Sequence, residues 1–138
     1  MANVADHPAP LELRLAAVPP SVTEARAAAA GYAGDAGADT ADVELAVAEA
    51  VANAVLHAFP DRTPGTVTVR AAVTRDSLII QVNDDGSGMR PNPDGGGLGL
   101  GLALIGRLTE SFSVSDVPSG GTSLRMSFQI GSGGPSLV

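Results

Sequence analysis

Hydrophobic and polar residues follow two different periods along this chain. Five short stretches are rich in alternating or β-branched residues, which is typical of strands, and three longer stretches repeat apolar residues at helical spacing. The predicted strands are Leu11–Leu15, Gly65–Val73, Ser77–Asn83, Phe112–Val117 and Thr122–Ile130, and the predicted helices cover about Ser21–Tyr32, Ala41–Phe59 and Leu98–Thr109. This order predicts an α+β two-layer sandwich, in which helices cover one face of a mixed, mostly antiparallel sheet.

Cap and turn residues set the expected ends of the first two helices. Ser21–Glu24 has the form of a capping box, so we expect the first helix to begin there. The segment Gly31–Gly37 is expected to be a loop because glycine favours turns. Asp39 or Thr40 can cap the second helix, and Pro60 should end it.

Length and composition favour a single folded domain. A chain of 138 residues buries about two thirds of the surface that its unfolded form exposes. We expect residues 11–130 to form the domain and the polar or glycine-rich ends, 1–10 and 131–138, to be disordered tails. Neither an internal repeat nor a second domain is indicated.

The charge of the chain excludes several classes of partner. A net charge of -7 argues against direct binding of nucleic acid or of anionic membranes, which requires a basic face. The sequence contains no apolar run near the length of about 20 residues that crosses a bilayer. Residues 1–10 carry neither a charged leader nor an apolar stretch, so we expect a cytoplasmic protein.

The chain lacks cysteine and lysine, and both absences bear on chemistry. With no cysteine, the chain has neither disulfides nor thiolate metal sites. All eight basic residues are arginine, so the lysine that P-loop enzymes and eukaryotic-type kinases use to hold phosphate is absent. A phosphate group here must be held by backbone amides, arginine or a metal ion.

The second predicted helix carries three polar residues on one side. Glu49, Asn53 and His57 are four residues apart, and residues at this spacing share a helix face. The rest of the segment is almost wholly apolar, so these groups need either solvent or partners. The stripe is therefore either a solvated face or a site where an amide ligates magnesium and a carboxylate orients or deprotonates a hydroxyl.

The third predicted strand ends in an acidic, glycine-bearing segment. Asn83-Asp84-Asp85-Gly86-Ser87-Gly88 follows the strand residues, and such a segment is either an ordinary turn or a binding site. In a site, the Asp84 carboxylate can accept a hydrogen bond from the exocyclic amine of adenine. Guanine would present a carbonyl instead, which gives base selectivity.

A run of glycines and leucines leads into the third predicted helix. The free amides of Gly95–Leu102 and the positive end of the helix can together hold phosphate. The run does not fit the dinucleotide-binding pattern, because the third glycine position is Leu104. The alternative is a flexible connector whose leucines dock the helix.

Taken together, these motifs resemble the ATP-binding domain shared by gyrase, heat-shock chaperone, histidine kinase and mismatch-repair ATPases. The resemblance covers about Val43–Phe128, and within this superfamily the chain looks most like the stand-alone anti-sigma-factor serine kinases. The motifs that carry it are Glu49-x-x-x-Asn53 continued to His57, Asp84-x-Gly86-x-Gly88, Gly97-x-Gly99-Leu100-Gly101-Leu102 and Gly121-Thr122.

The resemblance implies ATP and Mg²⁺ as cofactors and gives roles to individual residues. Glu49 is the implied general base, Asn53 the magnesium ligand and Asp84 the adenine anchor. The other residues implied to contact the nucleotide are Gly86, Gly88, Gly97, Gly99, Gly101, Leu102 and Thr122. A lid, Met89–Gly96, is also implied, and His57 receives no role.

The resemblance further implies a sigma factor and an anti-sigma-factor antagonist as partners. The protein would bind the sigma factor in its ATP form and phosphorylate the antagonist on serine or threonine, and it is compatible with a homodimer. The first helix would face the partner, with Arg26 either as a contact or as a solvated arginine. Two alternatives remain: a non-catalytic ATP-dependent binding module, and a catalytic domain acting on a histidine of a separate protein.

Overall fold

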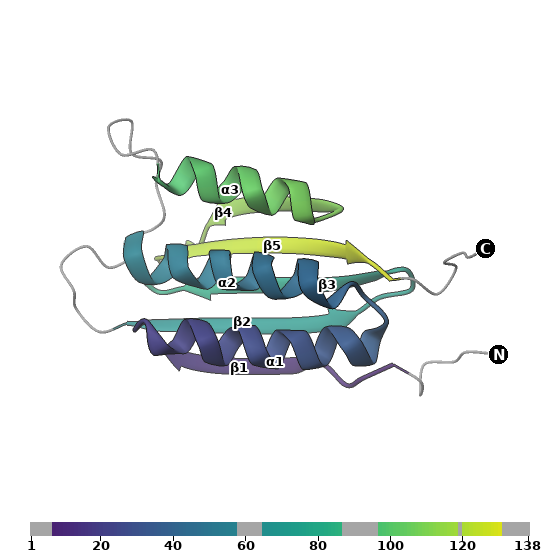
Figure 1. The fold of residues 1–138 in the computed structure, drawn as a ribbon. Helices are drawn as coiled ribbons and strands as arrows, with labels where there is room; N and C mark the ends of the chain where they lie inside the picture. The colour runs from purple at the N-terminus through teal and green to yellow at the C-terminus, as the bar shows by residue number, and fades with distance from the viewer. Residues whose placement is uncertain (1–6, 58–64, 87–96, 119, 131–138) are drawn as a thin grey trace.

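The computed structural model describes residues 7–57, 65–86, 97–118 and 120–130. Within them the chain forms three helices and five strands, in the order that the sequence predicts (Figure 1). These elements are β1 (Leu11–Ala16), α1 (Pro20–Ala36), α2 (Thr40–His57), β2 (Thr66–Val73), β3 (Ser77–Asp84), α3 (Gly97–Leu108), β4 (Ser111–Asp116) and β5 (Thr122–Gln129).

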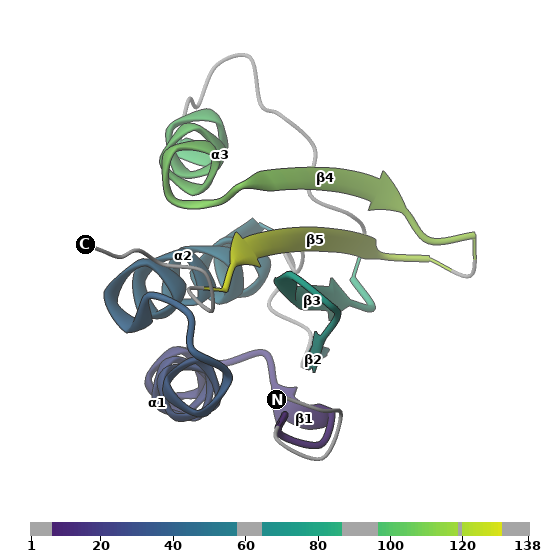
Figure 2. The same cartoon turned by 90° about the vertical axis from the view of Figure 1, so that its right-hand side faces the viewer.

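The strands form one sheet with the order β1-β2-β3-β5-β4. Each neighbouring pair in this order is antiparallel, so the described sheet is antiparallel throughout rather than mixed. All three helices lie over the same face, which leaves the opposite face open (Figures 1 and 2). The predicted α+β two-layer sandwich is confirmed.

The core lies between the sheet and the paired helices α1 and α2. On the sheet side, alternate positions of β2, β3 and β5 are fully or nearly fully buried. On the helix side most buried residues are alanine or valine, which lets the helices lie close to the strands at the packing density of protein interiors. The buried helix residues include Ala25, Ala29, Val43, Ala46, Val47, Ala50, Val51 and Ala54.

The start of α1 differs from the capping box that the sequence predicts. The helix begins at Pro20, and Pro19 in the cap position makes no side-chain cap hydrogen bond. Proline suits the first helical position because its missing N–H would have no partner there. Ser21 therefore lies inside the helix, and its hydroxyl donates to the Ala16 carbonyl at 2.6 Å.

The predicted loop over Gly31–Gly37 is also wrong, since α1 continues to Ala36. Each interior glycine costs a helix about 1 kcal/mol relative to alanine. Tyr32 and Ala33 are buried against the core in this last stretch, and burial of that face outweighs the cost. Gly37 ends the helix with φ 85°, a left-handed conformation that glycine adopts readily.

The predicted N-terminal cap of α2 is confirmed. The Asp42 amide donates to Asp39 Oδ1 at 3.0 Å, which satisfies one of the free amides of the first turn. The helix is described as far as His57, and Pro60 lies outside the described residues.

Four element ends meet at one end of the domain. The last turn of α2, the end of β3, the first turn of α3 and the start of β5 all lie on the same side of Figure 1. The antiparallel register pairs Asp84 at the end of β3 with Thr122 at the start of β5. Gly121 precedes that pair with φ 96°, and a Cβ atom there would overlap the Asp84 carbonyl oxygen.

We therefore predict that Gly121→Ala destabilises the protein far more than Gly120→Ala. Gly120 also has a positive φ, 111°, but a Cβ there meets open space, so its substitution adds backbone strain of about 1–3 kcal/mol. Gly121→Ala adds a backbone overlap to the same strain and should exceed about 4 kcal/mol. Urea unfolding of both variants measures the difference, and equal losses would contradict the assignment.

Candidate functional site

The first half of the site is built where α3 crosses α2. Glu49 and Asn53 lie one turn apart on α2, so their side chains share a face. Gly101 of α3 lies directly against both, because a Cβ atom on it would be 2.5 Å from Glu49 Oε2 and 2.8 Å from Asn53 Nδ2. The structure thus brings together three residues that the sequence assigns to the site.

Asn53 is a buried amide with an unmet hydrogen-bonding requirement. Its exposed fraction is 3%, and its Nδ2 has no partner among the described residues. Leaving a buried polar group unpaired costs about 1–3 kcal/mol. Such a cost is typical of a position that a ligand or water completes.

The second half of the site is the end of β3. Asp84 is 5% exposed; its Oδ1 accepts a hydrogen bond from the Gly86 amide at 3.0 Å, and its buried Oδ2 has no partner in the described part of the chain. Burial raises the pKa of this carboxyl above its usual value. The Gly86 and Thr122 amides partly offset the effect, and the charge of Asp85 adds to it.

The surroundings of Asp84 suit a planar ligand with a hydrogen-bond donor. One carboxylate oxygen is held by backbone, which leaves the other free to accept a second hydrogen bond. Gly86 carries no side chain, and Thr122, across the strand pair from Asp84, is fully buried. Asp85 fixes the adjoining edge, because its Oδ1 accepts a hydrogen bond from the Thr66 amide at 2.9 Å. No motif in the sequence indicated that contact.

Several predicted site residues are described only in part or not at all. Gly88 and the lid Met89–Gly96 lie outside the described residues. Gly97 and Gly99 belong to the first turn of α3, whose leading amides have no partners within the helix. Leu102 packs against the hydrophobic core, so its side chain contributes to packing.

The chain can supply only part of a metal coordination shell. Among the described residues, no group of three His, Cys, Asp or Glu side chains could hold a metal ion. Asn53 offers one hard oxygen ligand of the kind that Mg²⁺ accepts, and Mg²⁺ usually takes its other ligands from water and phosphate. The residues present therefore fit a magnesium ion that arrives with a nucleotide.

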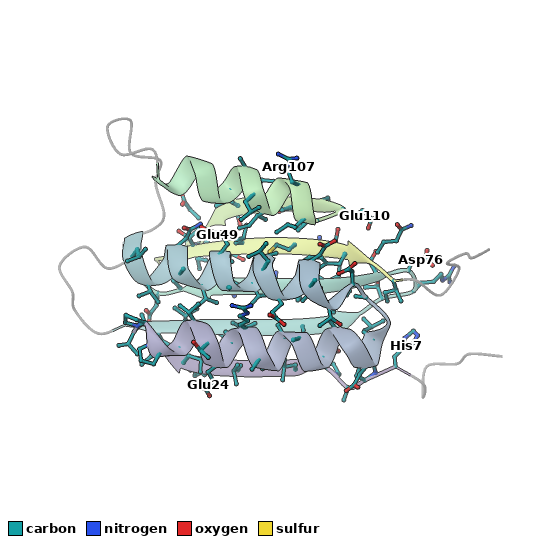
Figure 3. All side chains as sticks on the ribbon, in the orientation of Figure 1. His7, Glu24, Glu49, Asp76, Arg107 and Glu110 are labelled. Atoms are coloured by element: carbon teal, nitrogen blue, oxygen red, sulfur yellow. The ribbon has the colours of Figure 1, made fainter. Side chains whose placement is uncertain are left out.

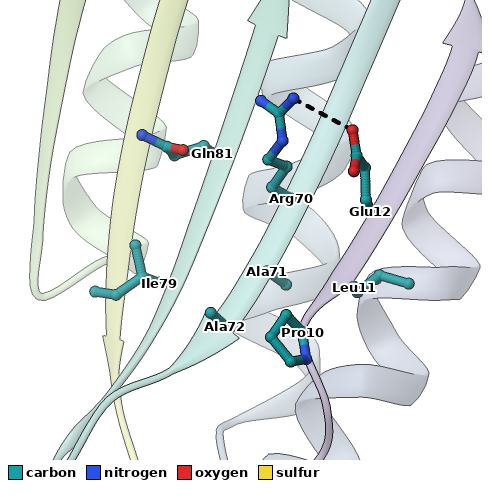
Figure 4. A pocket seen from close by; sticks show the side chains of 8 residues that line it. All are labelled: Pro10, Leu11, Glu12, Arg70, Ala71, Ala72, Ile79 and Gln81. Atoms are coloured by element: carbon teal, nitrogen blue, oxygen red, sulfur yellow. Dashed lines mark hydrogen bonds and ion pairs between the residues drawn. The ribbon is translucent and has the colours of Figure 1, made fainter.

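In the described part of the chain, two hollows lie on the open face of the sheet. One of about 340 Å³ is lined by β1, β2 and β3 and contains the ion pair between Arg70 and Glu12 at 3.2 Å (Figure 4). The other, of about 370 Å³, reaches the end of β3 and is lined by Asp84 and Asp85 of the candidate site as well as by Thr68 and Asn83. Thr68 and Asn83 are register partners on the face opposite the helices, because neighbouring strand positions face opposite ways.

Comparison with known proteins identifies the family. The model of the histidine kinase-like ATPase domain matches residues 11–128, almost the whole described fold. The chain belongs to the histidine kinase-like ATPase domain family. The resemblance drawn from the four sequence motifs is thereby confirmed.

Two similar proteins are named as an anti-sigma factor and as a serine-protein kinase. An anti-sigma F factor of Caldanaerobacter subterraneus subsp. tengcongensis is 30% identical over 104 residues, which are 67% of this chain and 72% of the relative. A serine-protein kinase RsbW of Listeria monocytogenes is 35% identical over 80 residues, 56% of this chain and 51% of the relative.

A solved structure agrees with the fold. The crystal structure of the RsbU and RsbW domains of a Mycobacterium tuberculosis protein aligns with a TM-score of 0.68 and 25% identity. The alignment covers 88% of this chain and 33% of that one. Among the described helices of the present domain, none is long and apolar enough to cross a membrane.

The raised pKa of Asp84 leads to a prediction on stability. Because folding raises this pKa, the folded protein holds the proton more tightly than the unfolded chain, in which an aspartate has a pKa of about 3.9. The carboxyl therefore contributes most to stability below about pH 4, and its contribution falls as the pH rises through the raised pKa.

Asp84→Asn removes this titration, so the melting temperature of the variant minus that of the native protein should rise between pH 4 and pH 7. Thermal unfolding of both nucleotide-free proteins across that range measures the difference. A difference that falls with pH would mean that the fold stabilises the carboxylate, contrary to the burial of Asp84.

Proposed function

We propose that the protein is an ATP-dependent protein serine kinase that also sequesters a sigma factor and phosphorylates the antagonist of that interaction. Among the described residues three buried side-chain atoms lack a hydrogen-bond partner, Asn53 Nδ2, Asn83 Oδ1 and Asp84 Oδ2, and the observation that carries the proposal is the first and the last of them. They belong to the end of the domain where α2, β3, α3 and β5 meet (Figure 1). Relatives named anti-sigma F factor and serine-protein kinase support the same function.

In this proposal Asp84 binds the adenine base. Its free oxygen accepts a hydrogen bond from the exocyclic amine, and Gly86, Gly88 and Thr122 lie beside the base. A guanine in the same place would turn a carbonyl toward a buried carboxylate, which costs more than a lost hydrogen bond because both groups are acceptors. The site therefore favours ATP over GTP.

The phosphates are bound without lysine. The leading amides of α3, at Gly97 and Gly99, point out of the first turn, where the helix dipole favours negative charge. Magnesium, when bound with the nucleotide, neutralises charge on the phosphates, and Asn53 supplies its protein ligand. Phosphoryl transfer needs mainly positioning and charge neutralisation, and these groups provide both.

Glu49 is the proposed general base. Its carboxylate lies beside Asn53, since both are within 3 Å of the position that a Cβ on Gly101 would occupy. A base in this place can accept the proton of a serine hydroxyl as the hydroxyl attacks the terminal phosphate. Figure 3 places Glu49 on α2, near the end of the domain where the four elements meet.

The partner surface is proposed to include α1, whose Arg26 forms an ion pair within the domain. Arg26 is paired with Glu44 of α2, at 2.7 Å between Nη2 and Oε1. Both side chains are at least partly exposed, so the pair contributes little to stability and can open when an acidic group of a partner competes for Arg26.

Partner capture tests the sequestering function. The protein should retain a sigma factor from a lysate of its source organism only when magnesium and ATP are present, and a second captured protein should carry phosphoserine or phosphothreonine. Asp84→Asn is the matched control and should capture neither. Capture without a phosphorylated product would indicate a non-catalytic module, and acid-labile phosphohistidine would indicate transfer to histidine; either result contradicts the proposed kinase.

The general base is tested by Glu49→Gln, which keeps the size of the side chain but cannot accept the proton. Transfer of labelled phosphate to the captured antagonist should fall by at least about 100-fold, while ATP binding is retained. Glu110→Gln, at the opposite end of the domain (Figure 3), is the matched control and should transfer phosphate at the native rate. Full activity of Glu49→Gln would exclude Glu49 as the base.

A further inference from the structure

Gly101 lies where no other amino acid would fit without moving the site. A Cβ atom built on it would be 2.5 Å from Glu49 Oε2, 2.8 Å from Asn53 Nδ2 and 3.2 Å from Asn53 Oδ1. Carbon atoms in proteins approach other heavy atoms at about 3.5–4.0 Å. The three atoms are the polar ends of the two α2 side chains to which we give chemical roles.

Gly101 is also poorly placed to bind phosphate with its own amide. The helix α3 begins at Gly97, and only the first four amides of a helix lack partners within it. In a regular α-helix that begins at Gly97, the amide of residue 101 would donate to the carbonyl of residue 97. The phosphate contact that the sequence motif implies for this glycine stays a prediction, and the place of Gly101 against Glu49 and Asn53 suggests a different role.

A glycine inside a helix needs a reason, because alanine there is more stable by about 1 kcal/mol. For Gly101 the reason is steric, because the Glu49 carboxylate and the Asn53 amide occupy the space that a side chain at position 101 would fill. Both are ends of flexible side chains rather than backbone, so they can swing away from a methyl group while α2 and α3 keep their packing. A methyl group at position 101 should therefore disturb the site and leave the fold intact.

We propose that Gly101 is a positioning residue that sets where the Glu49 carboxylate and the Asn53 amide lie. The inference rests on the proposed function and deepens it: the glycine acts on magnesium binding and on proton transfer through the two α2 side chains. Its effect is therefore confined to the magnesium-dependent part of nucleotide binding and to the rate of phosphoryl transfer.

The test compares Gly101→Ala with Gly106→Ala on the same helix. Both variants gain the same helix propensity. The Cβ at position 106 would be 3.0 Å from the Phe112 ring, which is 37% exposed and can shift. Calorimetry should show that both variants bind ATP as the native protein does when magnesium is absent. With magnesium, Gly101→Ala should lose the gain in affinity that the native protein and Gly106→Ala retain.

Phosphoryl transfer by Gly101→Ala should fall by about 100-fold, the cost of displacing a catalytic group by about 1 Å, while Gly106→Ala transfers at the native rate. The inference is overturned if Gly101→Ala weakens ATP binding equally with and without magnesium, because that result assigns the glycine to the phosphates. It is also overturned if both variants behave alike. Failure of the native protein to bind ATP would instead reject the proposed function.

A stability measurement tests the contact without any nucleotide. If the methyl group at position 101 collides with the Glu49 carboxylate, removal of that carboxylate should relieve the collision. The melting temperature lost on Gly101→Ala should then be smaller in a Glu49→Ala background than in the native background. An equal loss in both backgrounds would show that the two residues do not interact and would overturn the inference.

Discussion

The proposed site depends on two of the three buried side-chain atoms that lack a partner in the described part of the chain. Asn53 Nδ2 and Asp84 Oδ2 are shielded from water and have no partner among the described residues, and each such atom costs free energy that the apolar core must offset. The core can do so because valine, alanine and leucine side chains cover the rest of α2 and β3. A ligand that brings a hydrogen-bond acceptor to Asn53 Nδ2 and a donor to Asp84 Oδ2 would complete both atoms.

The geometry around these atoms explains how a chain without lysine can bind a nucleotide. In the proposed site, a carboxylate at the end of a strand recognises the base, and the phosphates meet the start of α3, where helix amides replace the missing cation. Glu49 and Asn53 then complete the site from α2, and Gly101 keeps space for both. Because helix amides and a magnesium ion would neutralise the phosphates, the site needs few basic side chains. This suits a domain with a net charge of -7.

Much of the fold could be predicted from the sequence, because apolar periodicity determines which face of each element is buried. The strands and α2 follow that pattern closely, and the family motifs indicated which residues gather at one end. The extent of α1 could not be predicted, because packing of Tyr32 and Ala33 outweighs the local preference of glycine for loops. The place of Gly101 against Glu49 also required the structure, since contacts between helices depend on how the helices cross.

The most direct test of this account is a calorimetric titration of the native protein with ATP and, separately, with GTP, both in the presence of magnesium. Because Asp84 is proposed to accept a hydrogen bond from the 6-amino group of adenine, which guanine replaces with a carbonyl, ATP should bind with measurable heat and GTP should bind at least about 100-fold more weakly. Absence of ATP binding, or equal affinity for the two nucleotides, would contradict the account.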